Sequence, residues 1–190
     1  MHPIGTQALS AFDTAAIVGE LKDRQEVIDA LHRFGLGLDP QDRELLASAL
    51  AADAGLDYRS VAAMWGADHP LMVGRHTIVN LLLSTFAGRV DTTHTVTNPR
   101  AQVDGDTARL AALVQVHHLL KVDRDQHALL TNRYTVDLTR EGAHWVMHRI
   151  HIDTAWYTGD PAAIFSRWKR PPAVNEAVFV ARLLPTPRFG

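Results

Sequence analysis

The stretch ARLAALVQVHHLLK, from Ala108 to Lys121, decides how the second half of the chain folds. Apolar residues fill every second position of it, with His118 as the polar exception in that series. A period of two is the period of a β-strand, whose successive side chains point to opposite faces of a sheet. We therefore predict a long strand whose apolar face carries His118.

The rest of the second half has the same period. Strands are predicted over residues 90–98, 127–140 and 143–156, with hairpin turns at Asp104-Gly105 and Glu141-Gly142. A short helix is expected over 161–168. Four of the nine prolines follow in the tail, which we expect to be extended.

The first half has the 3.6-residue period of helices. Asp23 and Glu26 resemble a capping box, which predicts a helix start there. This helix ends at Asp39, because the residue before Pro40 is pushed out of the α region. A second helix is predicted from Pro40, a first strand after Ala51, a loop over 60–70 and a third helix over 74–86. Helices followed by a strand meander indicate an α+β fold, with helices on one face of a curved, mostly antiparallel sheet.

Length and composition narrow the classes of function. The 190 residues fit one domain, and we divide them into an extension (1–22), a domain (23–168) and a tail (169–190). A net charge of −2 argues against nucleic-acid and membrane partners. The absence of cysteine excludes disulfides, thiolate metal sites and cysteine nucleophiles. No phosphate-loop, dinucleotide or serine-elbow motif is present, and we expect no cofactor. We also expect no metal, because the inward-facing candidates are only two histidines and one carboxylate. The first residues do not resemble a secretory signal, and we expect a cytoplasmic location.

Three polar residues stand at positions where apolar ones are expected: Asp39, His94 and His118. A histidine among valines needs a hydrogen-bond partner, and a carboxylate that supplies one also raises the basicity of the other ring nitrogen. We predict that Asp39 hydrogen-bonds His118. Two other readings stay open: Asp39 as the N-cap of the helix that begins at Pro40, and His118 as an ordinary core residue.

Six motifs together resemble the SnoaL-like branch of the nuclear transport factor 2-like superfamily, and within it scytalone dehydratase. They are GLDPQDRELL (37–46), LDYRSV (56–61), TTHTVTN (92–98), VQVHHLL (114–120), HWVMHRIHIDTAW (144–156) and PAAIF (161–165). The resemblance implies a cone-shaped roll, a curved sheet wrapped around helices with a deep pocket. It also implies that the functional aspartate, tyrosine and two histidines of the dehydratase fall on Asp39, Tyr58, His94 and His118.

The sequence departs from that pattern at two places. Leu38 stands where the dehydratase has a tyrosine, and Asn132 and Tyr134 take the places of its serine and asparagine. These changes argue against scytalone as the substrate.

We therefore expect a cofactor-free acid–base enzyme that acts on a small apolar carbonyl compound of the polyketide, aromatic or terpenoid kind. His118 would be the base in a dehydratase-type elimination, oriented by Asp39, with Tyr58 and His94 polarising the carbonyl. The expected pocket residues are Trp65, Val116, Asn132, Tyr134, His148, Ile150 and Ile152.

Two alternatives use the same cone: a polyketide cyclase or isomerase, and a non-catalytic binding or assembly domain. A pocket filled by Trp65, Tyr134 and Phe165 would indicate the binding domain, whereas an open pocket with Asp39 against His118 would indicate the enzyme. We also expect a homo-oligomer, dimer or trimer, formed through the outer sheet face. Its residues would be Arg109, Leu113, Gln115, His117, Leu119, Trp145, Met147 and His151.

Overall fold

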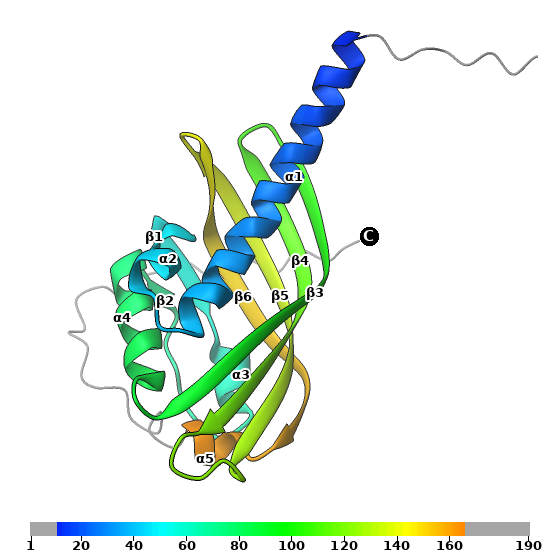
Figure 1. Ribbon diagram of the computed structural model, residues 1–190. Helices are drawn as coiled ribbons and strands as arrows, with labels where there is room; N and C mark the ends of the chain where they lie inside the picture. Colours follow the sequence, from blue (N-terminus) through cyan, green and yellow to red (C-terminus); the bar gives the residue numbers. More distant parts are fainter. Residues whose placement is uncertain (1–10, 166–190) are drawn as a thin grey trace, which may run out of the picture.

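The computed structural model describes residues 11–165 (Figure 1). The tail 169–190 and the end of the short helix predicted over 161–168 lie outside the described residues. The helices are α1 (Ala11–Leu38), α2 (Arg43–Ser48), α3 (Arg59–Ala63), α4 (Arg75–Phe86) and α5 (Pro161–Phe165). The strands are β1 (Leu50–Asp57), β2 (Met72–Val73), β3 (Val90–Asp104), β4 (Thr107–Leu120), β5 (His127–Glu141) and β6 (His144–Gly159).

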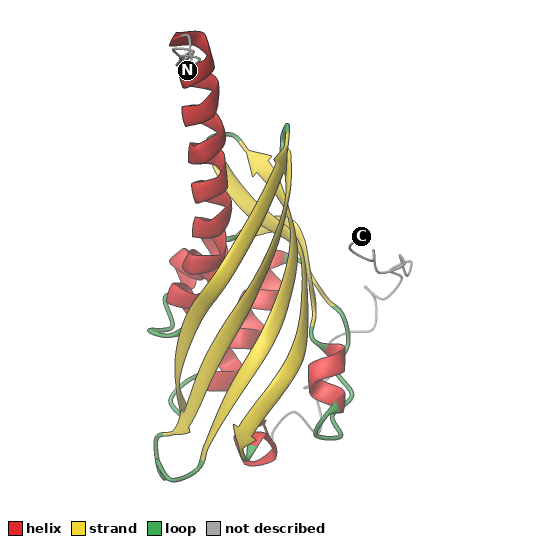
Figure 2. Ribbon diagram, turned by 90° about the vertical axis from the view of Figure 1, so that its right-hand side faces the viewer, coloured by secondary structure: helices red, strands yellow, loops and turns green. Residues whose placement is uncertain are grey.

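One sheet contains all six strands of the described chain, in the order β2-β1-β6-β5-β4-β3. Within this sheet only the β1–β6 pair is parallel, and the long stretch of chain between these two strands allows the crossover that a parallel pair requires. The successive long strands pair as antiparallel hairpins. The sheet curves, and Figure 2 shows helices behind it with the opposite face uncovered. The predicted α+β class with a curved, mostly antiparallel sheet is confirmed.

Bulges bend the long strands and change which side chains face inward. Strand β6 has two bulges relative to β5, with Ala155 and His148 as the extra residues. At the second bulge Asp137 pairs with Arg149, whereas the next residue, Leu138, pairs with Met147 and passes over His148. A bulge shifts the alternation of a strand by one position. Met147 is therefore fully buried, and so is Trp145, which makes the prediction that they belong to the outer surface wrong.

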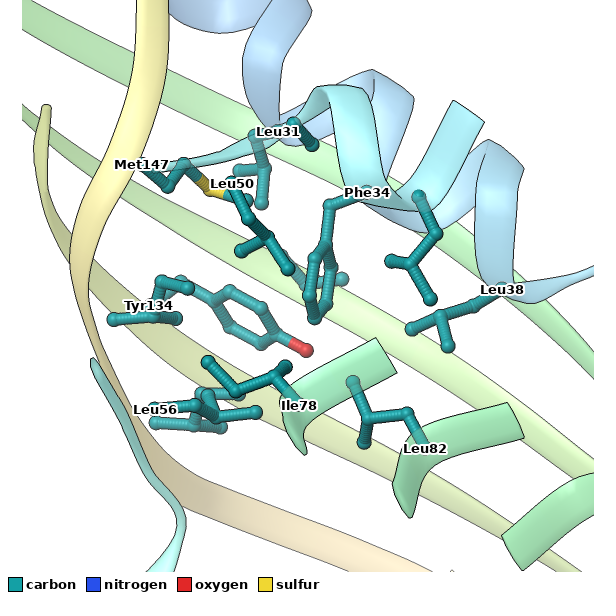
Figure 3. Packing of buried hydrophobic residues seen from close by; sticks show 14 of the residues in the cluster. Leu31, Phe34, Leu38, Leu50, Leu56, Ile78, Leu82, Tyr134 and Met147 are labelled. Carbon is teal, nitrogen blue, oxygen red and sulfur yellow. The ribbon is translucent and has the colours of Figure 1, made fainter. Parts of the chain in front are cut away.

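The core lies between α1, α4 and the concave face of the sheet. The apolar side of α1, which follows the 3.6-residue period, packs there: Leu31, Phe34 and Leu38 are all at most 3% exposed. Figure 3 shows them meeting Ile78 and Leu82 of α4 and Tyr134 of the sheet. Burying such side chains contributes about 1.5–3 kcal/mol each, which fixes α1 against the sheet.

Two predicted helix starts are wrong. The helix α1 begins at Ala11, so Asp23 lies inside it, where its carboxylate accepts a hydrogen bond from Trp145 Nε1 at 3.3 Å. The helix α2 begins at Arg43, and its N-cap is Asp42, whose side chain accepts from the backbone N–H groups of Glu44 and Leu45 at 3.0 Å each. Asp39 is thus not a helix cap. A short helix, α3, begins at Arg59 and covers the first residues of the predicted loop over 60–70.

The junction between α1 and α2 depends on Gly37. A Cβ atom at this position would lie 2.4 Å from the backbone nitrogen of Leu46, so only glycine lets the two helices approach this closely. This contact fixes where α1 ends and therefore where Asp39 lies. Among residues 11–165, no helix has the length and apolar character needed to cross a membrane.

Candidate active site

A narrow cavity opens between α1, α4 and the inner face of the sheet, with a volume of about 40 Å³. Most of its wall is apolar, and five side chains give it polar groups. The lining residues are Phe34, Leu38, Leu56, Tyr58, Leu82, Phe86, His94, Val116, His118, Asn132, Tyr134 and Ile152. Such a mixture, an apolar wall with a few convergent polar groups, is typical of small-molecule sites.

The carboxylate of Asp39 lies behind one wall of this cavity and binds β3 through three hydrogen bonds. Its Oδ1 accepts from Thr92 Oγ1 at 2.8 Å and from His94 Nδ1 at 2.6 Å, and its Oδ2 accepts from the backbone N–H of His94 at 2.8 Å. Thr92 and His94 are two residues apart and therefore face the same side of β3. The end of α1 is thus fastened to the strand at one point.

This arrangement determines which nitrogen of His94 carries the proton. Burial by itself raises the pKa of Asp39, but the hydrogen bonds from His94 and Thr92 outweigh it, and the pKa is lowered from its usual value. An ionised carboxylate only accepts hydrogen bonds, so Nδ1 of His94 donates. In the neutral ring the lone pair is then on Nε2, the nitrogen that a proton acceptor uses.

His118 lies next to this pair, one strand further on. It pairs in register with Thr92, while His94 pairs with Val116, so both histidines lie on the cavity face. His118 is 4% exposed, and its ring packs against Phe165 and Phe86 with centroid distances of 5.0 and 5.7 Å.

The environment of His118 keeps its ring neutral. Burial, aided by the nearby His94, lowers the pKa of His118 to about 3. Its Nδ1 is buried and has no hydrogen-bond partner among the described residues. An unpaired buried nitrogen is unfavourable by about 1–3 kcal/mol, which a ligand with a polar group at this point would relieve.

Tyr58, Tyr134 and Asn132 complete the polar lining. Burial raises the pKa of both phenols well above its usual value, so they stay protonated and can donate. Asn132 is 2% exposed, and its Oδ1 accepts from Thr154 Oγ1 at 2.8 Å, which leaves the amide NH2 group as its donor. Three neutral donors therefore border the cavity that contains His94.

The structure brings together most of the residues predicted from the sequence. Seven of them line the cavity: Tyr58, His94, Val116, His118, Asn132, Tyr134 and Ile152. The predicted hydrogen bond between Asp39 and His118 is wrong, because the carboxylate forms its three hydrogen bonds within the described residues with Thr92 and His94. Asp39 meets the other histidine because β3, not β4, passes the end of α1.

Three predicted pocket residues lie elsewhere. His148 is at the β6 bulge, where its Nδ1 is 3.3 Å from the exposed carboxylate of Asp53. Ile150 is buried but is not part of the lining. Trp65 stacks on Phe165 at a centroid distance of 5.1 Å, so it supports the ring that packs on His118.

Sequence reasoning missed Thr92 and Phe86, and it named Phe165 as a residue that could fill the pocket but not as a neighbour of His118. The alternation of β3 places Thr92 and His94 on one face of the strand, and this pattern could have identified Thr92. Phe86 and Phe165 come from the ends of α4 and α5, and no local pattern tells that these ends meet. The described part of the chain contains no group of three or more His, Asp or Glu side chains arranged to hold a metal ion.

The sequence matches the SnoaL-like domain family over residues 19–151, and the chain belongs to this family. No match was found among curated proteins. Solved structures with the same nuclear transport factor 2-like cone include Kfla4162 from Kribbella flavida, with a TM-score of 0.67 and 19% identity over 77% of this chain and 99% of that one.

Two further similar structures carry names that denote a reaction. One is a hexachlorocyclohexane dehydrochlorinase, LinA type 2, with a TM-score of 0.64 and 19% identity over 83% of this chain and 99% of that one. The other is a proposed scytalone dehydratase from Novosphingobium aromaticivorans, with a TM-score of 0.64 and 18% identity over 74% and 89%. At these identities the likeness shows the fold.

Proposed function

We propose that this protein catalyses an elimination from a small, largely apolar carbonyl compound, with His94 as the general base and Asp39 as its positioning partner. The observation that carries the proposal is the 2.6 Å hydrogen bond from His94 Nδ1 to Asp39, in a cavity otherwise lined by apolar groups and neutral donors. This exchanges the roles that the sequence indicated for the two histidines.

The first step is removal of a proton from the carbon next to the carbonyl. Nε2 of His94 takes the proton, and the C–H electron pair moves to form an enolate. The imidazolium that results is stabilised by the carboxylate of Asp39, as in other acid–base pairs of this type. The enolate then expels the β-hydroxyl group, the imidazolium returns its proton to that oxygen, and water and an unsaturated carbonyl compound leave.

The other polar groups stabilise the charge that develops on the carbonyl oxygen. Tyr58, Tyr134 and the amide of Asn132 are neutral donors in a narrow site with a mostly apolar wall, where hydrogen bonds to an oxyanion are strong. His118 stays neutral and offers its unpaired Nδ1 to a polar group of the substrate. Its low pKa makes it a weak base, which favours His94 for the proton transfer.

The named relatives support an elimination. A dehydratase removes water and a dehydrochlorinase removes hydrogen chloride, so both names denote loss of a small molecule from a carbon skeleton. Isomerisation and ring closure begin with the same proton abstraction and differ in where the enolate reacts. The apolar lining favours a substrate of the polyketide, aromatic or terpenoid kind.

The test compares the wild type with matched variants on a panel of β-hydroxy ketones and polyketide-like phenols, following the absorbance of the conjugated product. We expect His94→Gln to lose about 10²–10⁴-fold in turnover, and Asp39→Asn to retain a weak residual rate. The control is His117→Gln, the same change on the exposed side of β4, which should remain fully active.

Full turnover by His94→Gln would end the proposal. A wild type that binds members of the panel and converts none of them would favour the non-catalytic binding domain instead.

A further inference from the structure

The N-terminal half of α1 extends away from the body of the protein (Figures 1 and 2). Every residue from 14 to 22 is exposed, and the first buried residue of the helix is Val27. A free helix shorter than about 12–15 residues is marginally stable in water. Because its residues are exposed, this half of α1 does not have the tertiary packing that normally stabilises a helix of this length.

Apolar side chains gather on this unpacked half. The described chain has nine exposed large hydrophobic residues, and three of them lie close together in α1. The exposed fraction is 44% for Ile17, 58% for Val18 and 60% for Leu21. They share one side of the helix, and Gln25 and Ile28 continue that side toward the body. We call the set Ile17, Val18, Leu21, Gln25 and Ile28 the α1 seam.

The α1 seam lies beside the side of α1 that packs on the sheet, and only Ile28, at the end nearest the body, is half-buried and also packs against the core. The packed side is formed by Val27, Leu31, Phe34 and Leu38. Val18, Leu21, Gln25 and Ile28 are spaced by three, four and three residues, which is the alternation that lets two helices pack side by side.

We propose that the α1 seam pairs with the α1 seam of a second copy of this chain, in an antiparallel helix pair with a two-fold axis near Leu21. In this pairing Leu21 meets Leu21 of the partner, and Val18 lies opposite the partner's Gln25. The two bodies then lie at opposite ends of the pair, so they do not obstruct each other.

The charges beside the α1 seam fit this occupant. Glu20 and Arg24 are exposed and form an ion pair at 2.7 Å within one helix. In the antiparallel pair Glu20 of each copy lies near Arg24 of the other copy. Each Glu20 can therefore form its ion pair with either Arg24, and no charge is left unpaired. Residues 14–28 contain three acidic and two basic side chains, so two copies repel each other little.

The proposal is tested by disulfide formation, because the natural chain contains no cysteine. We expect oxidised Leu21→Cys to form a covalent dimer readily at tens of micromolar. Leu36→Cys, also exposed on α1, should not, because antiparallel pairing separates the two Leu36 positions by roughly 45 Å at about 1.5 Å per residue. Equal cross-linking of both variants, or of neither, would overturn the antiparallel pairing.

Light scattering supplies a second readout that does not depend on a cysteine. Leu21→Glu should halve the mass of the wild-type particle, and it should fold normally, since the site is exposed and glutamate favours helices almost as well as leucine. The matched control is Val122→Glu, on a surface turn where the side chain is 88% exposed, and it should keep the wild-type mass. A monomeric wild type, or a Leu21→Glu variant of unchanged mass, would contradict the proposal.

Discussion

Two histidines on neighbouring strands have opposite environments in this cavity. His94 donates to an ionised carboxylate, whereas His118 packs against the rings of Phe86 and Phe165, which also contact each other, and its Nδ1 has no hydrogen-bond partner among the described residues. Environments that differ in this way separate the protonation behaviour of two groups of the same type. Under the proposed mechanism this difference favours His94 for the proton transfer and leaves His118 as a neutral hydrogen-bonding group.

The buried His118 makes the stability of the fold depend on acid pH. Its pKa is 6.5 when exposed and about 3 in the fold, so below pH 6.5 the unfolded chain binds a proton that the folded chain cannot bind. The free energy of unfolding should therefore fall by about 1.4 kcal/mol per pH unit from this group as the pH drops from 6.5 toward 3.

The substitution His118→Phe removes the titratable imidazole and keeps an aromatic ring in contact with the same neighbours. We expect the variant to lose less stability than the wild type between pH 7 and pH 4 when both are unfolded with urea. Identical pH dependence of the two proteins would show that His118 is not a buried neutral group. Asp39 is present in both proteins, so its own titration cancels in the comparison.

At the scale of single residues, the sequence identified the polar residues of the site, but the predicted hydrogen bond joined Asp39 to the wrong histidine. Asp39, His94 and His118 were all recognisable, because each interrupts an apolar pattern. Which histidine meets Asp39 depends on how the end of α1 crosses the sheet. That crossing is set by packing between distant elements, including the close approach of Gly35 to His94, where an added Cβ would lie 3.0 Å from the His94 Cβ.

At the scale of elements, strand periodicity predicted the four long strands well but could not show their bulges. Alternation counted from His144 places His148 inside the cone, and the extra residue in β6 moves it outside. The bulge at His148 is far from any glycine of the strand and therefore has no reliable sequence signature. The predicted direction of the side chains between His144 and the bulge is wrong for the same reason.

The join between α1 and α2 gives a prediction at the same scale. Gly37→Ala should lower the free energy of unfolding by about 1–3 kcal/mol or more, because the added methyl group meets the backbone of α2. Gly19→Ala is the matched control in the same helix: an added Cβ there has no neighbour within 4 Å, and alanine favours helix formation. Urea unfolding checks both. Equal stability of the two variants would mean that α2 does not depend on the Gly37 contact.

At the scale of the whole molecule, the cone leaves one face of the sheet uncovered. The β4 residues Arg109, Leu113, Gln115 and Leu119 are half-buried on that face, and self-association through it stays a prediction. Leu113→Lys should reduce the particle mass in light scattering without preventing the cross-link at Leu21→Cys, since the two surfaces are separate. An unchanged mass would contradict an interface on this face.

The size of the cavity depends on how the helices pack on the sheet, and it therefore belongs to the scale of the whole molecule. Its volume of about 40 Å³ has room for a few water molecules, whereas sites for drug-sized ligands measure about 300–1,000 Å³. A ring-containing substrate therefore requires the surrounding elements to move apart.

The most direct test of the proposed chemistry is exchange of carbon-bound hydrogen for deuterium next to a carbonyl, followed by NMR in D2O. It requires no knowledge of the natural substrate, only simple cyclic ketones whose binding is first detected by saturation transfer. We predict that the wild type accelerates the exchange, that His94→Gln abolishes the acceleration, and that His118→Gln retains part of it. Exchange that survives in His94→Gln but is lost in His118→Gln would contradict the assignment and make His118 the base.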